Sequence, residues 1–546
     1  MQHSSEASSI ESACIAPLPK PRLATTLTNV LDVQSTWLVA AVSLLWLSAT
    51  TGLYPLLLPD EGRYVGIAWH MLSTGQYAVP MLDGLPFFHK PPLFYWLTAL
   101  SLSVFGVNEW AARLVSVGGA VLTITVLFWF LKNYVNTRIA LLAALILMSS
   151  PLLFGASHYA NMDMTVGGLV TATIVALAVA ALGYEQHGQY RTALLTAYAV
   201  AAAAFLTKGL IGIVIPGGVI FFWLLWRRRY DTMRRLLWLP GIAIFLLLAL
   251  PWMYAMQQRY GGFFDYFIVN QHLQRFTGNS FNNAQAVWFY APVLLGLMLP
   301  WSLKLWRLAD RAYWRNLQHQ RIRSLMLIWL LFVLVFFSLP NSKLVGYILP
   351  AIAPFAYFVA EAWAPRLAGT SGARSLRMLG SFLAISLSIC IAAAMVMVAW
   401  PQPGTKALAL NLKSYYGPSD KIVMLERYRY DLPFYLGAGK SIFVVSDWDD
   451  PELQSTDNWR RELYDAGRFD PVAAANLLIN KQGLLRKLCN DRVVDLWLMG
   501  QHDSPTRYPY LQGWVPDLQD GKLRVWHVPA GAPLTFCAEM PKDVQE

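Results

Sequence analysis

Long runs of apolar side chains recur through the first 400 residues of the chain, separated by short polar segments. A helix that crosses the hydrocarbon core of a bilayer needs about 20 consecutive, mainly apolar residues. We therefore predict a polytopic bundle of about 11–13 transmembrane helices. Eleven runs stand out, at residues 36–56, 114–131, 139–155, 164–183, 192–207, 209–226, 236–256, 287–306, 324–340, 345–363 and 378–400.

The segment between the first two runs, residues 57–113, is too long for a simple connector. Its apolar side chains follow helical spacing from Tyr64 to Leu72, which predicts a helix along the membrane surface that ends at Gly75. A hairpin-like turn at Asp83-Gly84 comes next, and a second amphipathic helix runs through Val104. We expect this whole segment to lie on the outer face of the membrane.

Residues 401–546 are more polar and contain strand-like runs at 421–425, 441–445, 493–498 and 523–528, between helical stretches. The predicted fold class is therefore mostly α. A helical membrane domain at residues 36–400 carries outer-face amphipathic helices, and a small α/β domain follows at residues 401–546.

The composition excludes a soluble protein. Of 546 residues, 56% are hydrophobic and 14% are charged, whereas a soluble domain carries roughly 25% charged residues. The 43 Lys and Arg against 32 Asp and Glu give a net charge of +11. Most basic residues of the first 400 positions fall in alternate loops, as the positive-inside rule requires of cytoplasmic loops. The charge is explained by topology, and no nucleic-acid partner is indicated.

The same rule predicts the orientation. Residues 1–35 form a polar tail with Lys20 and Arg22 ahead of the first run, and we expect this tail in the cytoplasm. The first run is interpreted as an anchor, because no small-residue cleavage site follows it. An odd number of spans places residues 401–546 outside, where Cys489 and Cys537 would share an oxidising compartment and are predicted to pair.

Acidic side chains are rare in the membrane-spanning part, so those at its outer mouth are candidates for chemistry. Asp60 and Glu61 begin the surface helix, and Asp163 follows the third run. Asp60 and Asp163 could instead cap the helices that they precede. Glu61 is not needed for a cap. We select all three as candidate catalytic residues.

Three lysines on the predicted outer side are candidates for binding an anion. Lys90 precedes two prolines, Lys208 ends a span, and Lys343 occupies a tight loop just before Tyr347. Each lysine could instead extend its ammonium group to the lipid headgroups. His89 and His272 could together bind a divalent metal ion, Zn or Mg/Mn.

Four short motifs occur in order on the predicted outer face: Asp60-Glu61-Gly62-Arg63-Tyr64, Phe88-His89-Lys90-Pro91, Phe205-Leu206-Thr207-Lys208-Gly209 and Ser342-Lys343-Leu344-Val345-Gly346-Tyr347-Ile348-Leu349-Pro350. Together they resemble the aminoarabinose transferase (ArnT-like) family of integral-membrane glycosyltransferases, which belongs to the GT-C superfamily and is related to protein O-mannosyltransferases. The resemblance covers about residues 36–363 and is more diffuse over residues 364–546. It implies a GT-C fold and a polyprenyl-phosphate sugar donor. In a bacterium the carrier would be undecaprenyl phosphate, the location the inner membrane, and the outer side the periplasm.

The resemblance also implies roles for individual residues. Asp60 and Asp163 match the family's acidic pair, and His272 matches a position near a metal. Arg63, Lys90 and Tyr347 match positions around the donor phosphate, to which we add Lys208 and Lys343 from their placement. His89 departs from the family, which tends to have an acidic residue before that lysine. The identity of the sugar therefore does not follow from the resemblance.

Breaking the glycosyl–phosphate bond builds negative charge on the phosphate, which Arg63 and Lys90 could stabilise. We expect an inverting single displacement onto lipid A, LPS or another envelope glycan. A hydroxyl acceptor would need Asp60 as general base, whereas a phosphate acceptor would need none. Two alternatives stay open, a protein O-glycosyltransferase of the mannosyltransferase kind and a transporter or flippase of lipid-linked sugars. The outer α/β domain is expected to shape the acceptor entrance.

Overall fold

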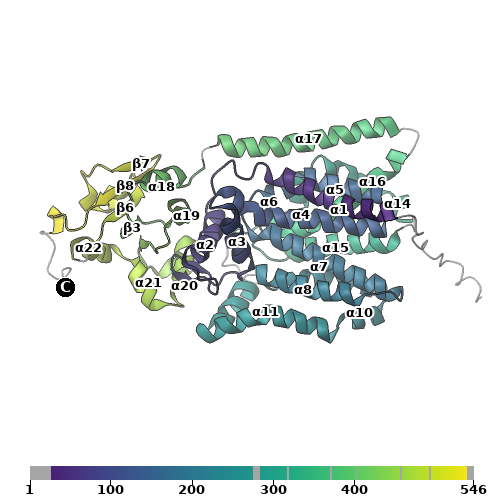
Figure 1. The fold of residues 1–546 in the computed structure, drawn as a ribbon, viewed down its shortest axis with the longest axis horizontal. Helices are drawn as coiled ribbons and strands as arrows, with labels where there is room; N and C mark the ends of the chain where they lie inside the picture. Colours follow the sequence, from purple (N-terminus) through teal and green to yellow (C-terminus); the bar gives the residue numbers. More distant parts are fainter. Residues whose placement is uncertain are drawn as a thin grey trace, which may run out of the picture.

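The computed structural model describes residues 26–274, 283–315, 319–368, 372–400, 402–454, 458–490 and 493–537. A helical bundle occupies one end of its long axis, and an α/β region occupies the other (Figure 1). We call residues 402–537 the C-terminal α/β region. Helices α2 (Asp60–Thr74) and α3 (Leu93–Phe105) lie between the two parts (Figure 1).

Helices lie at all eleven runs predicted to cross the membrane. Among the described residues, six helices are long and apolar enough to span a bilayer, and a bent pair makes a seventh. The first half of the bundle consists of α1 (Thr26–Ser48), α4 (Glu109–Tyr134), α5 (Thr137–Ser149), α6 (Pro151–Ser157), α7 (Met162–Glu185), α8 (Arg191–Lys208), α9 (Ile211–Trp226), α10 (Tyr230–Leu236) and α11 (Leu239–Arg259). The second half consists of η1 (Asp265–Gln274), α13 (Tyr290–Leu297), η2 (Trp301–Ala309), α14 (Arg311–Arg315), α15 (Gln320–Ser338), η3 (Val345–Ala351), α16 (Ile352–Ala368) and α17 (Gly372–Ala399).

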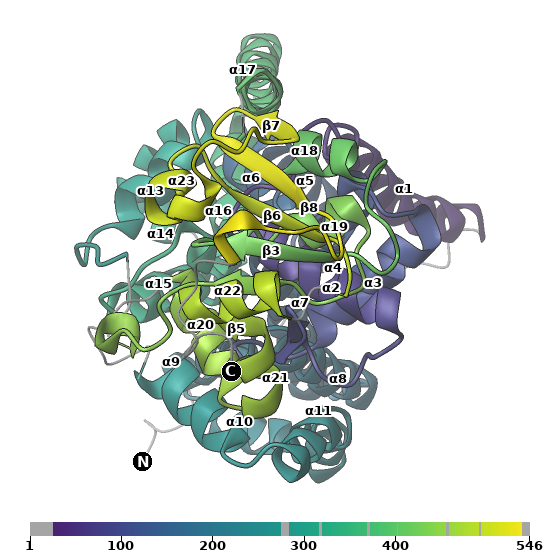
Figure 2. The same ribbon diagram turned by 90° about the vertical axis from the view of Figure 1, so that its left-hand side faces the viewer.

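Two predicted spans are interrupted rather than continuous. The run at 287–306 breaks at Pro300, which separates α13 from the 3₁₀-helix η2. The run at 139–155 bends by 60° between α5 and α6, where Pro151 begins the second helix. Proline has no backbone N–H and cannot continue the helical hydrogen bonds of the preceding turn. Helix α17 stands at the edge of the bundle (Figure 2), where most of its surface is not covered by protein.

The crossing of α4 and α7 depends on two glycines. A Cβ atom at Gly119 would lie 2.5 Å from the carbonyl oxygen of Met164, and one at Gly168 would lie 2.3 Å from that of Gly119. Small residues let membrane helices approach to backbone contact. This close crossing fixes the first turn of α7, which carries Asp163, against α4.

The predicted surface elements are confirmed. Helix α2 ends at Gly75, whose φ of 72° is left-handed and whose N–H donates to the carbonyl of Met71. Strands β1 (Met81–Leu82) and β2 (Leu85–Pro86) pair antiparallel around the turn at Asp83-Gly84. Both turn residues have positive φ, as a two-residue hairpin of this kind requires.

The C-terminal α/β region contains a six-stranded sheet of order β5-β4-β3-β6-β8-β7. Its strands are β3 (Lys421–Leu425), β4 (Phe443–Val445), β5 (Leu478–Ile479), β6 (Leu496–Gln501), β7 (Leu518–Asp520) and β8 (Leu523–Val528). Its helices are α18 (Lys406–Leu412), α19 (Leu432–Leu436), η4 (Pro451–Gln454), α20 (Trp459–Gly467), α21 (Pro471–Leu477), α22 (Lys481–Cys489), α23 (Ser504–Arg507), η5 (Pro509–Leu511) and η6 (Thr535–Cys537). Cys489 and Cys537 form a disulfide that joins α22 to η6, which confirms the predicted pairing.

The C-terminal α/β region shares one hydrophobic core with the segment from α2 to α3. Polar contacts fix the same interface. The N–H of Leu56 donates to the hydroxyl of Tyr435 over 2.7 Å, and that hydroxyl lies 3.1 Å from Glu109. The N–H of Ile442 donates to Asp83 in the hairpin turn over 2.8 Å. The region is therefore packed onto the surface helices and holds a defined position above the bundle.

Candidate functional site

A cavity of about 590 Å³ lies where the surface helices, the ends of the bundle helices and the C-terminal α/β region meet. Seven of the ten residues selected from the sequence line it, namely Asp60, Arg63, His89, Lys90, Asp163, Lys208 and Tyr347. The lining also contains Arg427, Arg429, Arg461, Glu462 and Asp465 from the C-terminal α/β region. Basic side chains therefore outnumber acidic ones, six to four, in the cavity wall.

Asp60 and Arg63 lie one helical turn apart on α2 and form an ion pair. Arg63 is also paired with Glu462 of helix α20, whose other carboxylate oxygen accepts from the hydroxyl of Tyr430. Pro59 rather than Asp60 is the N-cap of α2, so the interpretation of Asp60 as a cap is wrong. The carboxylate of Asp60 instead forms part of the cavity wall, and the side chain remains 31% exposed.

Tyr159 provides a second donor to Asp60. Its hydroxyl lies 3.2 Å from Oδ2 of Asp60. Burial and the negative charges of Asp60 and Glu61 raise the pKa of Tyr159, so the hydroxyl keeps its proton and donates. One carboxylate thus holds a guanidinium on one oxygen and a phenol on the other.

Asp163 lies in the first turn of α7 and forms an ion pair with Lys208 at the end of α8. Asn161 caps α7 by accepting from the N–H of Asp163 over 3.1 Å, so the interpretation of Asp163 as the cap is wrong. The ammonium group of Lys208 lies 4.5 Å from the ring centre of Tyr347. A Cβ at Gly346 would lie 2.2 Å from Oδ2 of Asp163, so the absent side chain makes room for this carboxylate.

His89 and Lys90 enter the cavity from the segment that links β2 to α3. The imidazole of His89 stacks on Phe87 with ring centres 4.2 Å apart, and the ring of Tyr266 lies 5.8 Å away on another side. These aromatic contacts fix the orientation of the imidazole. Lys90 adds a third cation to the cavity wall, with those of Arg63 and Lys208.

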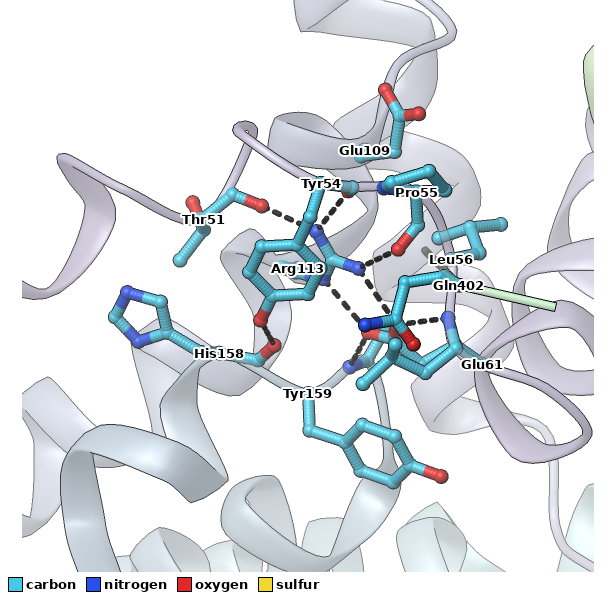
Figure 3. A network of polar contacts seen from close by, with 12 residues as sticks. Thr51, Tyr54, Pro55, Leu56, Glu61, Glu109, Arg113, His158, Tyr159 and Gln402 are labelled. Atoms are coloured by element: carbon cyan, nitrogen blue, oxygen red, sulfur yellow. Dashed lines mark hydrogen bonds and ion pairs between the residues drawn. The ribbon is translucent and has the colours of Figure 1, made fainter. Parts of the chain in front are cut away.

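Glu61 does not line the cavity, although it is adjacent to Asp60. It is fully buried and binds the guanidinium of Arg113 through two hydrogen bonds of 2.7 and 2.8 Å (Figure 3). Its oxygens also accept from the N–H groups of Leu57 and Ala160, both over 2.6 Å. These bonds join the carboxylate to α4 and to the segments that precede α2 and α7 (Figure 3).

Arg113 completes that network from α4. Its remaining N–H groups donate to the backbone carbonyls of Thr51, Tyr54 and Pro55. The side chain of Arg113 is fully buried and does not extend to the lipid headgroups. No local pattern indicates that the charges of Glu61 and Arg113, 52 positions apart, neutralise each other.

Two other selected residues lie outside the described cavity wall. The ammonium group of Lys343 donates to the carbonyls of Gln285 and Pro340 over 2.9 and 2.5 Å, and the side chain is 3% exposed. Lys343 therefore closes its own loop. The side chain of His272 lies outside the described residues.

No three His, Cys, Asp or Glu side chains within the described part of the chain gather into a group that could hold a metal ion. Among the described neighbours of His89 are the rings of Phe87 and Tyr266. The metal prediction for His89 and His272 stays a prediction, because the side chain of His272 is not described.

The comparisons with known proteins agree with this geometry. The family described as dolichyl-phosphate-mannose-protein mannosyltransferase matches residues 89–254. The chain is 34% identical, over 343 residues, to an undecaprenyl phosphate-alpha-4-amino-4-deoxy-L-arabinose arabinosyl transferase of Pseudomonas paraeruginosa, with 61% of this chain and 60% of the relative matched. A transferase of the same name from Aeromonas salmonicida is 34% identical over 311 residues, with 56% of each chain matched. The chain thus spans less than two thirds of these relatives in sequence.

The solved structure of ArnT from Cupriavidus metallidurans bound to undecaprenyl phosphate matches 92% of this chain and 98% of its own, with a TM-score of 0.74 and 22% identity. This chain has the GT-C membrane fold of ArnT. The archaeal oligosaccharyltransferase AglB from Archaeoglobus fulgidus is more distant, with a TM-score of 0.51 and 11% identity over 88% of this chain and 71% of its own. The resemblance inferred from the four motifs is confirmed, as is an integral membrane protein with several spans.

Proposed function

We propose that this chain transfers a sugar from undecaprenyl phosphate to an acceptor of the bacterial envelope, either lipid A, LPS or another glycan. One observation carries the proposal. Asp60, Arg63, Lys90, Asp163, Lys208 and Tyr347 come from five separate segments, and all line a single cavity at the end of the bundle. The similarity to named arabinosyl transferases and the ArnT fold support the same reaction class.

The donor phosphate would lie on the membrane side of the cavity, because its polyprenyl chain stays in the bilayer. Arg63, Lys90 and Lys208 supply positive charge there. Cations fixed at the leaving group stabilise the charge that develops as the glycosyl–phosphate bond breaks. Arg63 can bind a phosphate through two N–H groups, whereas each lysine acts as a point charge.

The transfer is a single displacement with inversion at the anomeric carbon. The acceptor oxygen forms a bond to that carbon while the electron pair of the breaking bond moves to the phosphate oxygen. If the acceptor is a hydroxyl, Asp60 takes its proton. Tyr159 and Arg63 hold Asp60 in place, and Lys208 holds Asp163 in the wall of the same cavity. We assign Glu61 a positioning role in this mechanism, since its carboxylate is enclosed by Arg113 and two backbone N–H groups.

The proposed topology follows from charge and redox chemistry. Residues 1–35 are cytoplasmic, residues 36–400 form the transferase domain with its catalytic loop at 57–113, and residues 401–546 lie in the periplasm. The distribution of Lys and Arg supports this orientation in the inner membrane. The Cys489–Cys537 disulfide also supports it, because such bonds persist in oxidising compartments.

The test is turnover by the purified protein in detergent, with undecaprenyl-phosphate sugars of defined structure as donors and lipid A as acceptor. The wild type is expected to release undecaprenyl phosphate and to add one sugar mass to the acceptor. Asp60→Asn is expected to abolish transfer to a hydroxyl while the protein stays folded. The proposal would be overturned if the wild-type protein, placed in vesicles, moved the donor across the membrane and left its glycosyl–phosphate bond intact.

A further inference from the structure

The sheet of the C-terminal α/β region has a topological switch point beside the cavity. Strand β3 pairs parallel with β4 on one side and with β6 on the other, and β4 pairs parallel with β5. The chain runs outward from β3 to β5 and then returns to the opposite side of β3 (Figure 2). In open parallel sheets, ligands bind at the carboxyl ends of the strands where the direction of winding reverses.

Segments that leave the carboxyl ends of two of these strands form one wall of the cavity. The segment after β3 contributes Arg427, Tyr428, Arg429 and Tyr430. Helix α20, which follows β4, contributes Trp459, Arg461, Glu462 and Asp465. Trp459 is only partly buried. The carboxyl ends of these strands therefore border the same cavity that Asp60 lines.

Arg427 and Arg429 place two positive charges at this edge. Burial lowers the pKa of Arg429, and the neighbouring charge of Arg427 lowers it further, while Asp431 opposes both effects. Among the ion pairs formed by described residues, none involves either arginine. Glu426, which precedes them, pairs with Arg507 instead. Arg429 is partly buried and Arg427 is exposed. Two guanidinium groups that repel each other gain from an anion bound by both.

The nearby carboxylates already have partners. Glu462 is bound by Arg63 and by the hydroxyl of Tyr430. Asp465 lies 3.8 Å from Arg461 and 3.4 Å from the hydroxyl of Tyr266. Asp431 is buried and accepts from the N–H of Thr405 over 2.7 Å. The charge at Arg427 and Arg429 is therefore available to a ligand in the cavity.

We propose that Arg427 and Arg429 form a subsite for a phosphate group on the saccharide headgroup of the acceptor. This inference rests on the proposed function, since it assigns the two ends of the cavity to two substrates. The donor phosphate is tethered to a membrane lipid and occupies the end with Lys90 and Lys208. A ligand at the sheet edge must be the other substrate. Two planar guanidinium groups, each with paired N–H donors, favour a phosphate or a similar oxyanion. The subsite holds the acceptor and takes no part in bond breaking.

The experiment measures binding by the full-length protein in detergent with three probes: bisphosphorylated lipid A, lipid A with its phosphates removed, and undecaprenyl phosphate. The variants are R427Q/R429Q, the charge-preserving R427K/R429K, and R524Q as a matched control. Arg524 lies on strand β8 of the same region, and its guanidinium donates to the nearby carbonyls of Gly521 and Leu523.

The expected result is at least about tenfold weaker binding of phosphorylated lipid A by R427Q/R429Q, with partial recovery in R427K/R429K and no change in R524Q. Undecaprenyl phosphate should bind all variants equally. The inference is overturned if the wild type binds lipid A equally well with and without phosphates, or binds neither form, or if R427Q/R429Q behaves like R524Q. If the wild type does not bind undecaprenyl phosphate at all, the proposed function is contradicted instead.

Discussion

Glu462 of helix α20 and Arg63 of helix α2 form an ion pair that joins the C-terminal α/β region to the membrane side of the cavity. The side chains are 11% and 12% exposed, so the pair is largely shielded from solvent. Because Arg63 also binds Asp60, Glu462, which lies 399 positions after Arg63 in sequence, is connected through Arg63 to the candidate catalytic carboxylate. The C-terminal α/β region is thus part of the cavity and does more than shape its entrance.

Glu462→Gln should loosen this connection. Glutamine keeps the shape of the side chain but cannot neutralise Arg63, and a charge-assisted hydrogen bond contributes roughly 1.5–3 kcal/mol. We expect a lower thermal midpoint and faster amide exchange across α20. Glu452→Gln, at an exposed position on η4, is the control. Equal exchange in the two variants would show that the ion pair does not hold the region in place.

Glu61→Gln should destabilise the protein far more than Asp60→Asn does. Glu61 is fully buried against Arg113, and removing one partner of such a pair costs about 3–5 kcal/mol, because it leaves an uncompensated charge. Thermal unfolding in detergent would report the difference. Replacing both partners, as in Glu61→Gln with Arg113→Met, should recover part of the loss. If Glu61→Gln keeps the wild-type midpoint but loses activity, the positioning role is refuted and a catalytic one is favoured.

Gly346→Ala should impair transfer without unfolding the protein. The new methyl group would lie 2.2 Å from Oδ2 of Asp163, so the carboxylate must shift from the position in which it pairs with Lys208. Displacements of about 1 Å in such sites cost on the order of 10²-fold in rate. The matched control is Gly380→Ala on α17, where a Cβ meets nothing within 4 Å. Similar turnover by both variants would argue against a role for the Asp163 geometry.

Asp83 should make the docking of the C-terminal α/β region sensitive to pH. Its carboxylate is buried at the hairpin turn, and burial raises its pKa although the N–H of Ile442 partly opposes this. A carboxyl group whose pKa is raised by folding contributes stability below its unfolded pKa, about 3.9, and loses it as pH rises through the folded value. Asp83→Asn should therefore gain thermal stability over wild type as pH rises from about 4 to about 8. A difference in midpoint that does not change with pH would exclude this explanation.

Local patterns in the sequence predicted most elements because their signals are short-range. Hydrophobic runs located the membrane helices, and the strands at Lys421–Leu425 and Leu523–Val528 were predicted with the observed limits. The prediction missed β5 and β7, which are two and three residues long. Strands of this length carry too few side chains for a recognisable alternation.

Only part of the candidate site could be predicted, because only some of its residues carry a short-range signal. Asp60, Asp163 and Lys208 stand out because charged residues are rare beside membrane spans. Glu462 and Arg429 do not stand out, since they occur in a polar region where charge is common. One local signal was available, the alternation of Arg427, Tyr428, Arg429 and Tyr430 directly after a predicted strand. All four line the cavity because this segment packs against α2, a contact that no local pattern contains.

Binding of undecaprenyl phosphate to purified Lys90→Gln and Lys343→Gln tests the central claim most directly, which is that the cavity holds the donor phosphate. Both lysines were selected from the sequence, but only Lys90 lines the cavity, whereas Lys343 donates to carbonyls in its own loop. The account predicts at least about tenfold weaker binding for Lys90→Gln and less than about threefold for Lys343→Gln. Equal losses in the two variants, or a loss confined to Lys343→Gln, would contradict it.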